Sequence, residues 1–76
     1  MTYFVQKRKK GSQEWETCST YEKKGAAITD CKWNALHMVD SEEHKTGVFE
    51  WEYRVITDTA VELLRYTIKD NKRVKA

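Results

Sequence analysis

The stretch VFEWEYRVIT, residues 48–57, alternates large apolar side chains with charged ones. Its two sets of alternating positions are Phe49, Trp51, Tyr53 and Val55 on one side and Glu50, Glu52 and Arg54 on the other. Successive side chains of a β-strand point to opposite faces, so a period of two predicts a strand with one buried and one solvated face. We therefore expect a sheet whose aromatic face forms the core and whose glutamates face water.

The preceding residues predict a β-hairpin and a long helix. Strands are expected at Thr2–Arg8 and Glu14–Tyr21, joined by a polar connection that contains Gly11. Alternation in the second strand would place Trp15, Thr17, Ser19 and Tyr21 on one side, shared with the other aromatics. The segment Lys24–His44 has apolar residues at helical spacing, and a helix here would cover the aromatic face. The stripe consists of Ala27, Ile28, Cys31, Ala35, Met38 and Val39.

A second helix is expected near the C-terminus. Thr59 and Glu62 have the spacing of a capping box, in which each side chain satisfies a free backbone amide of the first turn. Val61, Leu64 and Ile68 would then form its apolar stripe, followed by a basic tail. The predicted fold class is α+β in the order β-β-α-β-α, with a three-stranded antiparallel or mixed sheet, a long helix on one face and a short C-terminal helix. The strand order is left open.

Composition restricts the architecture further. The 76 residues carry a net charge of +2, with 39% hydrophobic and 34% charged residues, which fits one globular domain over residues 1–76 with a tail from about residue 70. No apolar run approaches the ~20 residues of a membrane span. Cys18 and Cys31 are too few for a disulfide framework, although a bridge between them would be possible in an oxidising compartment. We expect a cytoplasmic protein with reduced thiols and no membrane partner.

Several short segments are similar to a known group of proteins. They are Tyr3-Phe4-Val5-Gln6, Glu14-Trp15, Ala26-Ala27 at the start of a helix, and Tyr53-Arg54-Val55 at the end of a strand. In this pattern the chain resembles small uncharacterised proteins encoded by bacteriophages and mobile elements. The resemblance implies a β-β-α-β core and a mobile-element origin. It assigns no functional residue and has no counterpart for the C-terminal helix.

The long helix carries a second stripe opposite its core face, and we interpret it as a candidate protein-binding surface. Trp33, Leu36 and His37 lie on or beside this stripe, and tryptophan is enriched at interface hot spots. The expected function is a non-enzymatic binding module that contacts a protein partner, or a second copy in a homodimer, through this surface or an open sheet edge. The alternative is that the C-terminal helix covers Trp33 with Leu63, Leu64 or Tyr66.

Basic residues at both ends of the chain suggest a competing hypothesis, a nucleic-acid-binding accessory protein. The candidate contacts are Lys7, Arg8, Lys9 and Lys10 near the hairpin and Lys69, Lys72, Arg73 and Lys75 in the tail. Two such groups form one binding patch only if the fold brings them together. Stacking of bases on the sheet is not expected, because its solvated face would carry carboxylates that repel phosphate. Those carboxylates are Glu14, Glu16, Glu50 and Glu52.

No arrangement of residues predicts catalysis, a cofactor or a metal. His37, Asp40 and His44 have helical spacing, but the two imidazoles would lie roughly 10 Å apart, too far for one zinc ion. Cys31 and His37 would point to different sides of the helix. We therefore predict that the protein is not an enzyme and needs no cofactor.

Overall fold

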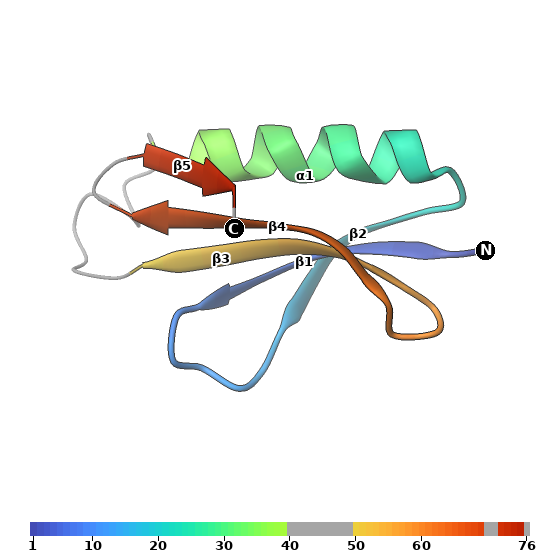
Figure 1. Cartoon of the computed structure of the whole chain (residues 1–76), viewed down its shortest axis with the longest axis horizontal. Coiled ribbons are helices and arrows are strands. Elements are labelled where there is room, and N and C mark those ends of the chain that lie inside the picture. The colour runs from blue at the N-terminus through green and yellow to red at the C-terminus, as the bar shows by residue number, and fades with distance from the viewer. Residues whose placement is uncertain (40–49, 70–71, 76) are drawn as a thin grey trace.

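The computed structural model describes residues 1–39, 50–69 and 72–75. These residues form one antiparallel sheet and one helix (Figure 1). The elements in chain order are β1 (Tyr3–Lys9), β2 (Glu16–Tyr21), α1 (Lys24–Val39), β3 (Trp51–Thr57), β4 (Glu62–Lys69) and β5 (Lys72–Lys75). The five strands are arranged in the order β2-β1-β3-β4-β5, so β1 lies between β2 and β3, and β2 and β5 are the edge strands. The described chain is α+β.

The predicted fold class is wrong in its C-terminal part, because residues expected as a second helix form β4 and β5. Leu64 and Ile68 are four residues apart, a spacing that fits both a helix and a strand. Tyr66 between them decides for the strand, since all three pack against the core face of the sheet. The expected three-stranded sheet is therefore a five-stranded one, and the residues expected as a frayed tail include an edge strand.

The expected capping box is replaced by a tight turn between β3 and β4. The Ala60 amide donates to the Thr57 carbonyl at 3.0 Å, and the Thr57 amide donates to the Val61 carbonyl at 3.0 Å. Ala60 has a φ of 65°, in the left-handed region that a helix start does not allow. This is the geometry of a type I turn followed by a bulge residue, a common three-residue hairpin connection. Thr57, and not Thr59, accepts the Val61 amide through its side-chain oxygen.

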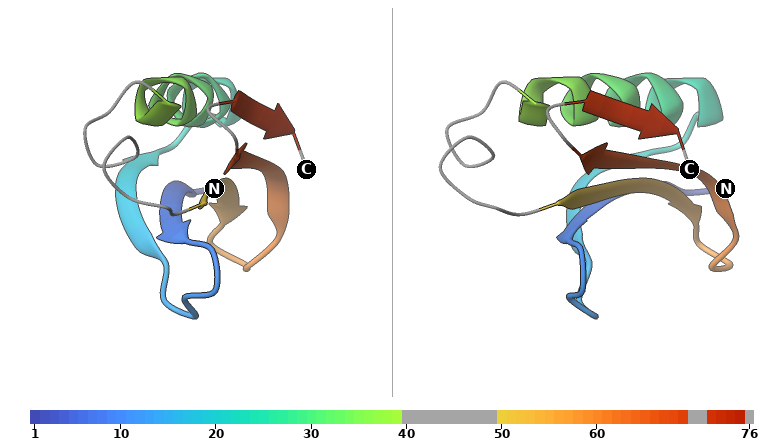
Figure 2. Two further views of the ribbon diagram at one scale, coloured as in Figure 1. Left: turned by 90° about the vertical axis from the view of Figure 1, so that its left-hand side faces the viewer. Right: turned by 60° about the vertical axis from the view of Figure 1, so that its left-hand side comes forward.

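The predicted apolar stripe of the long helix is confirmed for the residues whose side chains are described. Ala27, Cys31, Ala35 and Met38 are buried, and Ile28 is partly buried against them. They face a sheet surface formed by Val5, Trp51, Tyr53, Val55 and Ile68. Figure 2 shows α1 lying along this one face of the sheet, with the opposite face not covered by any described element. Residues 40–44 of the expected helix and Phe49 of the expected strand lie outside the described residues.

A β-bulge divides the residues that were expected on one side of the second strand. Val5 pairs with Ser19, whereas Gln6 pairs with Thr17, so Cys18 is an extra residue in β2. One extra residue moves the side chains on its N-terminal side to the opposite face of the sheet from the one that simple alternation predicts. Tyr21 therefore packs on the helix side of the sheet, while Thr17 accepts a hydrogen bond from Gln6 on the outer side.

The division of the third strand into buried aromatics and solvated glutamates is only half right. Trp51 and Tyr53 are 4% and 3% exposed on the helix side, as expected. Glu52 points to the outer side and is nevertheless only 7% exposed. A carboxylate buried to this extent needs charged or hydrogen-bonding partners, and it finds them on the neighbouring strands.

Candidate functional site

The first candidate site is a hollow between α1 and the edge strand β5, which we call the Trp33 groove. Its volume is about 320 Å³, and it is lined by Thr29, Lys32, Trp33, Leu36 and Arg73. Trp33 is 54% exposed and Leu36 is 37% exposed. The alternative, in which a C-terminal helix covers Trp33, is wrong, because Leu63, Leu64 and Tyr66 lie in β4. The groove therefore presents a large aromatic side chain to the surface.

Arg73 fixes the wall of the Trp33 groove that β5 supplies. Its Nη1 donates a hydrogen bond of 2.9 Å to the main-chain carbonyl of Lys32 in α1. Its guanidinium carbon lies 5.2 Å from the centre of the Tyr66 ring, within the range of a cation–π contact. On the helix side, the His37 ring lies 6.1 Å from that of Trp33, tilted by 56°. Two elements distant in sequence are thus tied together at the groove.

The described lining of the Trp33 groove carries positive charge. Lys32 and Arg73 are the ionisable residues among those that line it. Lys75 lies next to Arg73 along β5 on the same side of the sheet, because they pair with Tyr66 and Ile68, which face the core. A hollow with an apolar floor and a cationic wall favours a partner that combines an apolar side chain with carboxylates.

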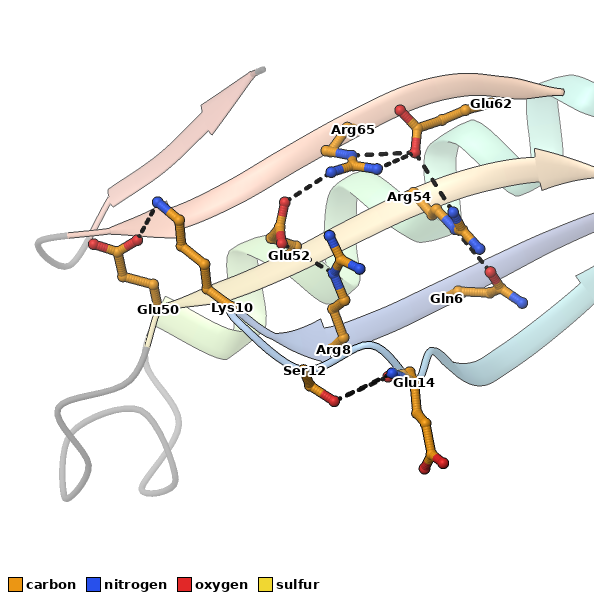
Figure 3. A network of polar contacts seen from close by, with 10 residues as sticks. All are labelled: Gln6, Arg8, Lys10, Ser12, Glu14, Glu50, Glu52, Arg54, Glu62 and Arg65. Carbon is orange, nitrogen blue, oxygen red and sulfur yellow. Dashed lines mark hydrogen bonds and ion pairs between the residues drawn. The ribbon is translucent and has the colours of Figure 1, made fainter. Parts of the chain in front are cut away.

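The outer face of the sheet carries a cluster that no sequence pattern predicts, which we call the arginine face. The Trp15 ring centre lies 4.2 Å from the guanidinium carbon of Arg8, 4.1 Å from that of Arg54 and 5.3 Å from that of Arg65. Glu52 accepts hydrogen bonds from Arg8 Nε at 3.0 Å and from Arg65 Nη1 at 2.9 Å (Figure 3). These five residues come from β1, β3, β4 and the hairpin.

Further hydrogen bonds complete the arginine face. Arg65 also donates to Glu62 Oε1 at 2.6 and 3.1 Å, and Arg54 Nε donates to Gln6 at 2.8 Å. The hydrogen bonds to Glu62 raise the pKa of Arg65, while burial lowers the pKa of Arg54. Three guanidinium groups face two carboxylates, so most of the charge of the cluster is compensated within the same face. We interpret it as a structural network that holds the outer face together.

A second hollow lies beside the β1–β2 hairpin, and we call it the hairpin hollow. Its volume is about 370 Å³, and its lining includes Lys7, Lys9, Trp15 and Trp51, with Glu14 and Glu16. The Nζ atoms of Lys7 and Lys9 each lie 5.7 Å from the centre of the Trp51 ring. Lys7 also lies 4.0 Å from a carboxylate oxygen of Glu16. Cations and carboxylates thus share this hollow.

The structure separates the residues that were predicted to bind nucleic acid. Lys7 and Lys9 lie on the helix side of β1, Arg8 lies on its outer side, and Lys10 forms an ion pair of 2.8 Å with Glu50. Arg73 and Lys75 are on β5, with β3 and β4 between them and β1. The side chains of Lys69 and Lys72 lie outside the described residues. The two basic groups therefore do not form one continuous patch among the described side chains.

In the described part of the chain, the cysteines and the candidate metal-ligand residues add no further site. Cys18 is an exposed free thiol and Cys31 a buried one, and burial raises the pKa of Cys31 to about 12. Asp40 and His44, which could have joined His37, lie outside the described residues. Within residues 1–39, 50–69 and 72–75, no three His, Cys, Asp or Glu side chains gather as metal ligands would.

No protein-family model, curated protein or solved structure matches this chain. Among the described residues, no helix has both the length and the apolar character that crossing a membrane requires.

Proposed function

We propose that the protein is a non-enzymatic binding module that contacts a protein partner through the Trp33 groove. The partner is another protein or a second copy of the chain. The observation that carries this proposal is the 54% exposure of Trp33 beside Leu36, at a hollow bounded by two elements. Tryptophan in such a position contributes 2 kcal/mol or more at many interfaces, on the order of a thirtyfold change in affinity.

Site-specific photocrosslinking tests this proposal with a matched control. Leu36 in the groove and Leu63 on β4 are both 37% exposed, so a photoreactive amino acid at either position has similar access to solvent. We expect crosslinking in cells from position 36 to one discrete protein or to a second copy, and none from position 63. Equal crosslinking from both positions, or none from position 36, would contradict the proposal.

Stability measurements separate a binding role from a core role for Trp33. Because the side chain is half exposed, Trp33→Ala should lower the free energy of unfolding by only about 1 kcal/mol and should abolish the crosslink from position 36. If the second copy is the partner, sedimentation should show a lower native mass for this variant. A large loss of stability with an unchanged native mass would show that Trp33 is a core residue.

A second candidate function is nucleic-acid binding at the hairpin hollow, and one observation favours it. Lys7 and Lys9 each place an ammonium group near the Trp51 ring, which gathers positive charge in the hollow and would attract phosphate. Binding of a single-stranded oligonucleotide at ~50 mM salt should then weaken steeply as salt rises, and Lys7→Ala should reduce the salt dependence. The control is Lys23→Ala, an exposed residue outside the hollow. No binding at low salt would exclude this function.

We propose that the protein is cytoplasmic and that a bacteriophage or mobile element encodes it. The two free thiols support a reducing compartment. The resemblance of the strand and helix segments supports the origin.

A further inference from the structure

The edge strand β5 offers backbone groups next to the Trp33 groove. No described strand pairs with its outer edge, and in the described part of the chain no backbone hydrogen bond from outside the sheet reaches it. Figure 2 shows β5 beside α1, so a chain laid along the outer edge of β5 would also run along the helix. Unpaired strand edges of this kind accept extended peptides, which add to the sheet through main-chain hydrogen bonds.

The charge of β5 limits which chain can be added. Its sequence is Lys-Arg-Val-Lys, with three cations in four residues. Pairing with β5 of a second copy would bring like charges opposite each other, which is destabilising. An acidic strand would have favourable cross-strand pairs at the same positions.

Side-chain direction connects the added strand with the groove. Arg73 and Lys75 face the helix side of the sheet, whereas Val74 faces the outer side and is half exposed. Every second residue of an added strand would therefore lie beside these two cations and face α1. An apolar residue among them could enter the groove next to Trp33 and Leu36, with carboxylates two positions away on either side.

We propose that the Trp33 groove and the free edge of β5 together bind an extended acidic segment of a partner protein, which adds to the sheet next to β5. This inference rests on the proposed function and specifies the partner class. The segment carries an apolar anchor with acidic residues at the second position before and after it. Main-chain hydrogen bonds to β5 supply a geometry that a helical partner could not use.

Synthetic peptides test the inference directly. The probe is acetyl-TDTFTET-amide, in which both acids lie on the same strand face as the phenylalanine. The matched control, acetyl-DTTFTTE-amide, has the same composition but places the acids on the opposite face, and acetyl-TKTFTKT-amide reverses the charge. We expect the probe to bind at ~1 mM or below, about tenfold more tightly than the control, with no binding of the lysine peptide. Equal affinities, or no binding of the probe, would overturn the inference.

Two further measurements distinguish this inference from the proposed function. Amide hydrogen exchange in β5 should slow when the probe binds, and Lys75→Glu should weaken the preference for the acidic peptide over the lysine peptide. If position 36 crosslinks to a partner in cells while β5 exchange and the charge preference are unchanged, the groove still binds protein but strand addition is wrong. If position 36 gives no crosslink, the proposed function itself fails.

Discussion

Glu52 is the one charged side chain that is buried among the described residues, and Glu52→Gln should reveal what its carboxylate contributes. The carboxylate is 7% exposed and accepts one hydrogen bond from Arg8 and one from Arg65. Glutamine keeps the size of the side chain but removes the negative charge. Its amide can accept from one guanidinium group, while its NH₂ group faces the other donor.

The size of the effect follows from these contacts. A hydrogen bond that involves a charged group is worth about 1.5–3 kcal/mol when it is shielded from water. The side chains of Arg8 and Arg65 are 22% and 28% exposed, so water partly replaces the lost acceptor. We therefore expect Glu52→Gln to lower the free energy of unfolding by about 2 kcal/mol. For a domain of this size, that loss corresponds to a decrease in Tm of about 8–16 °C.

Urea and thermal unfolding followed by circular dichroism measure this loss. Glu16→Gln is the matched control, because Glu16 is 74% exposed and lies 4.0 Å from Lys7. That variant should stay within about 0.5 kcal/mol of the parent. If Glu52→Gln is no more destabilising than Glu16→Gln, the arginine face does not depend on a buried carboxylate and our account of the outer sheet surface is wrong.

Three other predictions test the turn, the added strands and the thiols. Ala60→Gly should stabilise the protein by about 1 kcal/mol in urea unfolding, because glycine adopts the positive φ of 65° without strain; a destabilisation would contradict the turn. Ile68→Ala should cost about 2–5 kcal/mol by the same measurement, since Ile68 is fully buried, and a cost below about 1 kcal/mol would place it on the surface. Burial raises the pKa of Cys31 to about 12, so its thiolate is scarce at pH 8 and a thiol reagent should label Cys18 but not Cys31 until urea unfolds the chain; rapid labelling of both in the native state would contradict this burial.

The parts of the fold that were predictable are those with a strong periodic signal. Alternation identified β3 and the hairpin strands, and helical spacing identified the buried side of α1, from Ala27 to Met38. The segment after Thr57 was misassigned because Leu64 and Ile68 are compatible with both periods, and the threonine–glutamate spacing imitated a helix cap. Tyr66 and Thr67, both common in strands, were the available contrary signal.

The candidate site was only partly predictable for related reasons. Trp33 and Leu36 could be placed opposite the helix core from spacing alone, but Arg73 joins them only because β5 exists. The arginine face depends on the bulge at Cys18 and on the neighbours of Glu52 across the sheet. No residue in β2 marks the bulge, since it contains no glycine, and partners on other strands are not encoded by local periodicity.

The position of β1 has a consequence for how the chain acquires its structure. This first strand must receive neighbours on both sides, and its second neighbour is β3, with Val5 opposite Val55. The β1–β2 hairpin alone would be marginally stable in water. Most of the domain must therefore leave the ribosome before its sheet can assemble. Pairing of β1 with β3 closes a loop that contains β2 and α1, and the entropy lost in closing this loop precedes the core contacts that compensate for it.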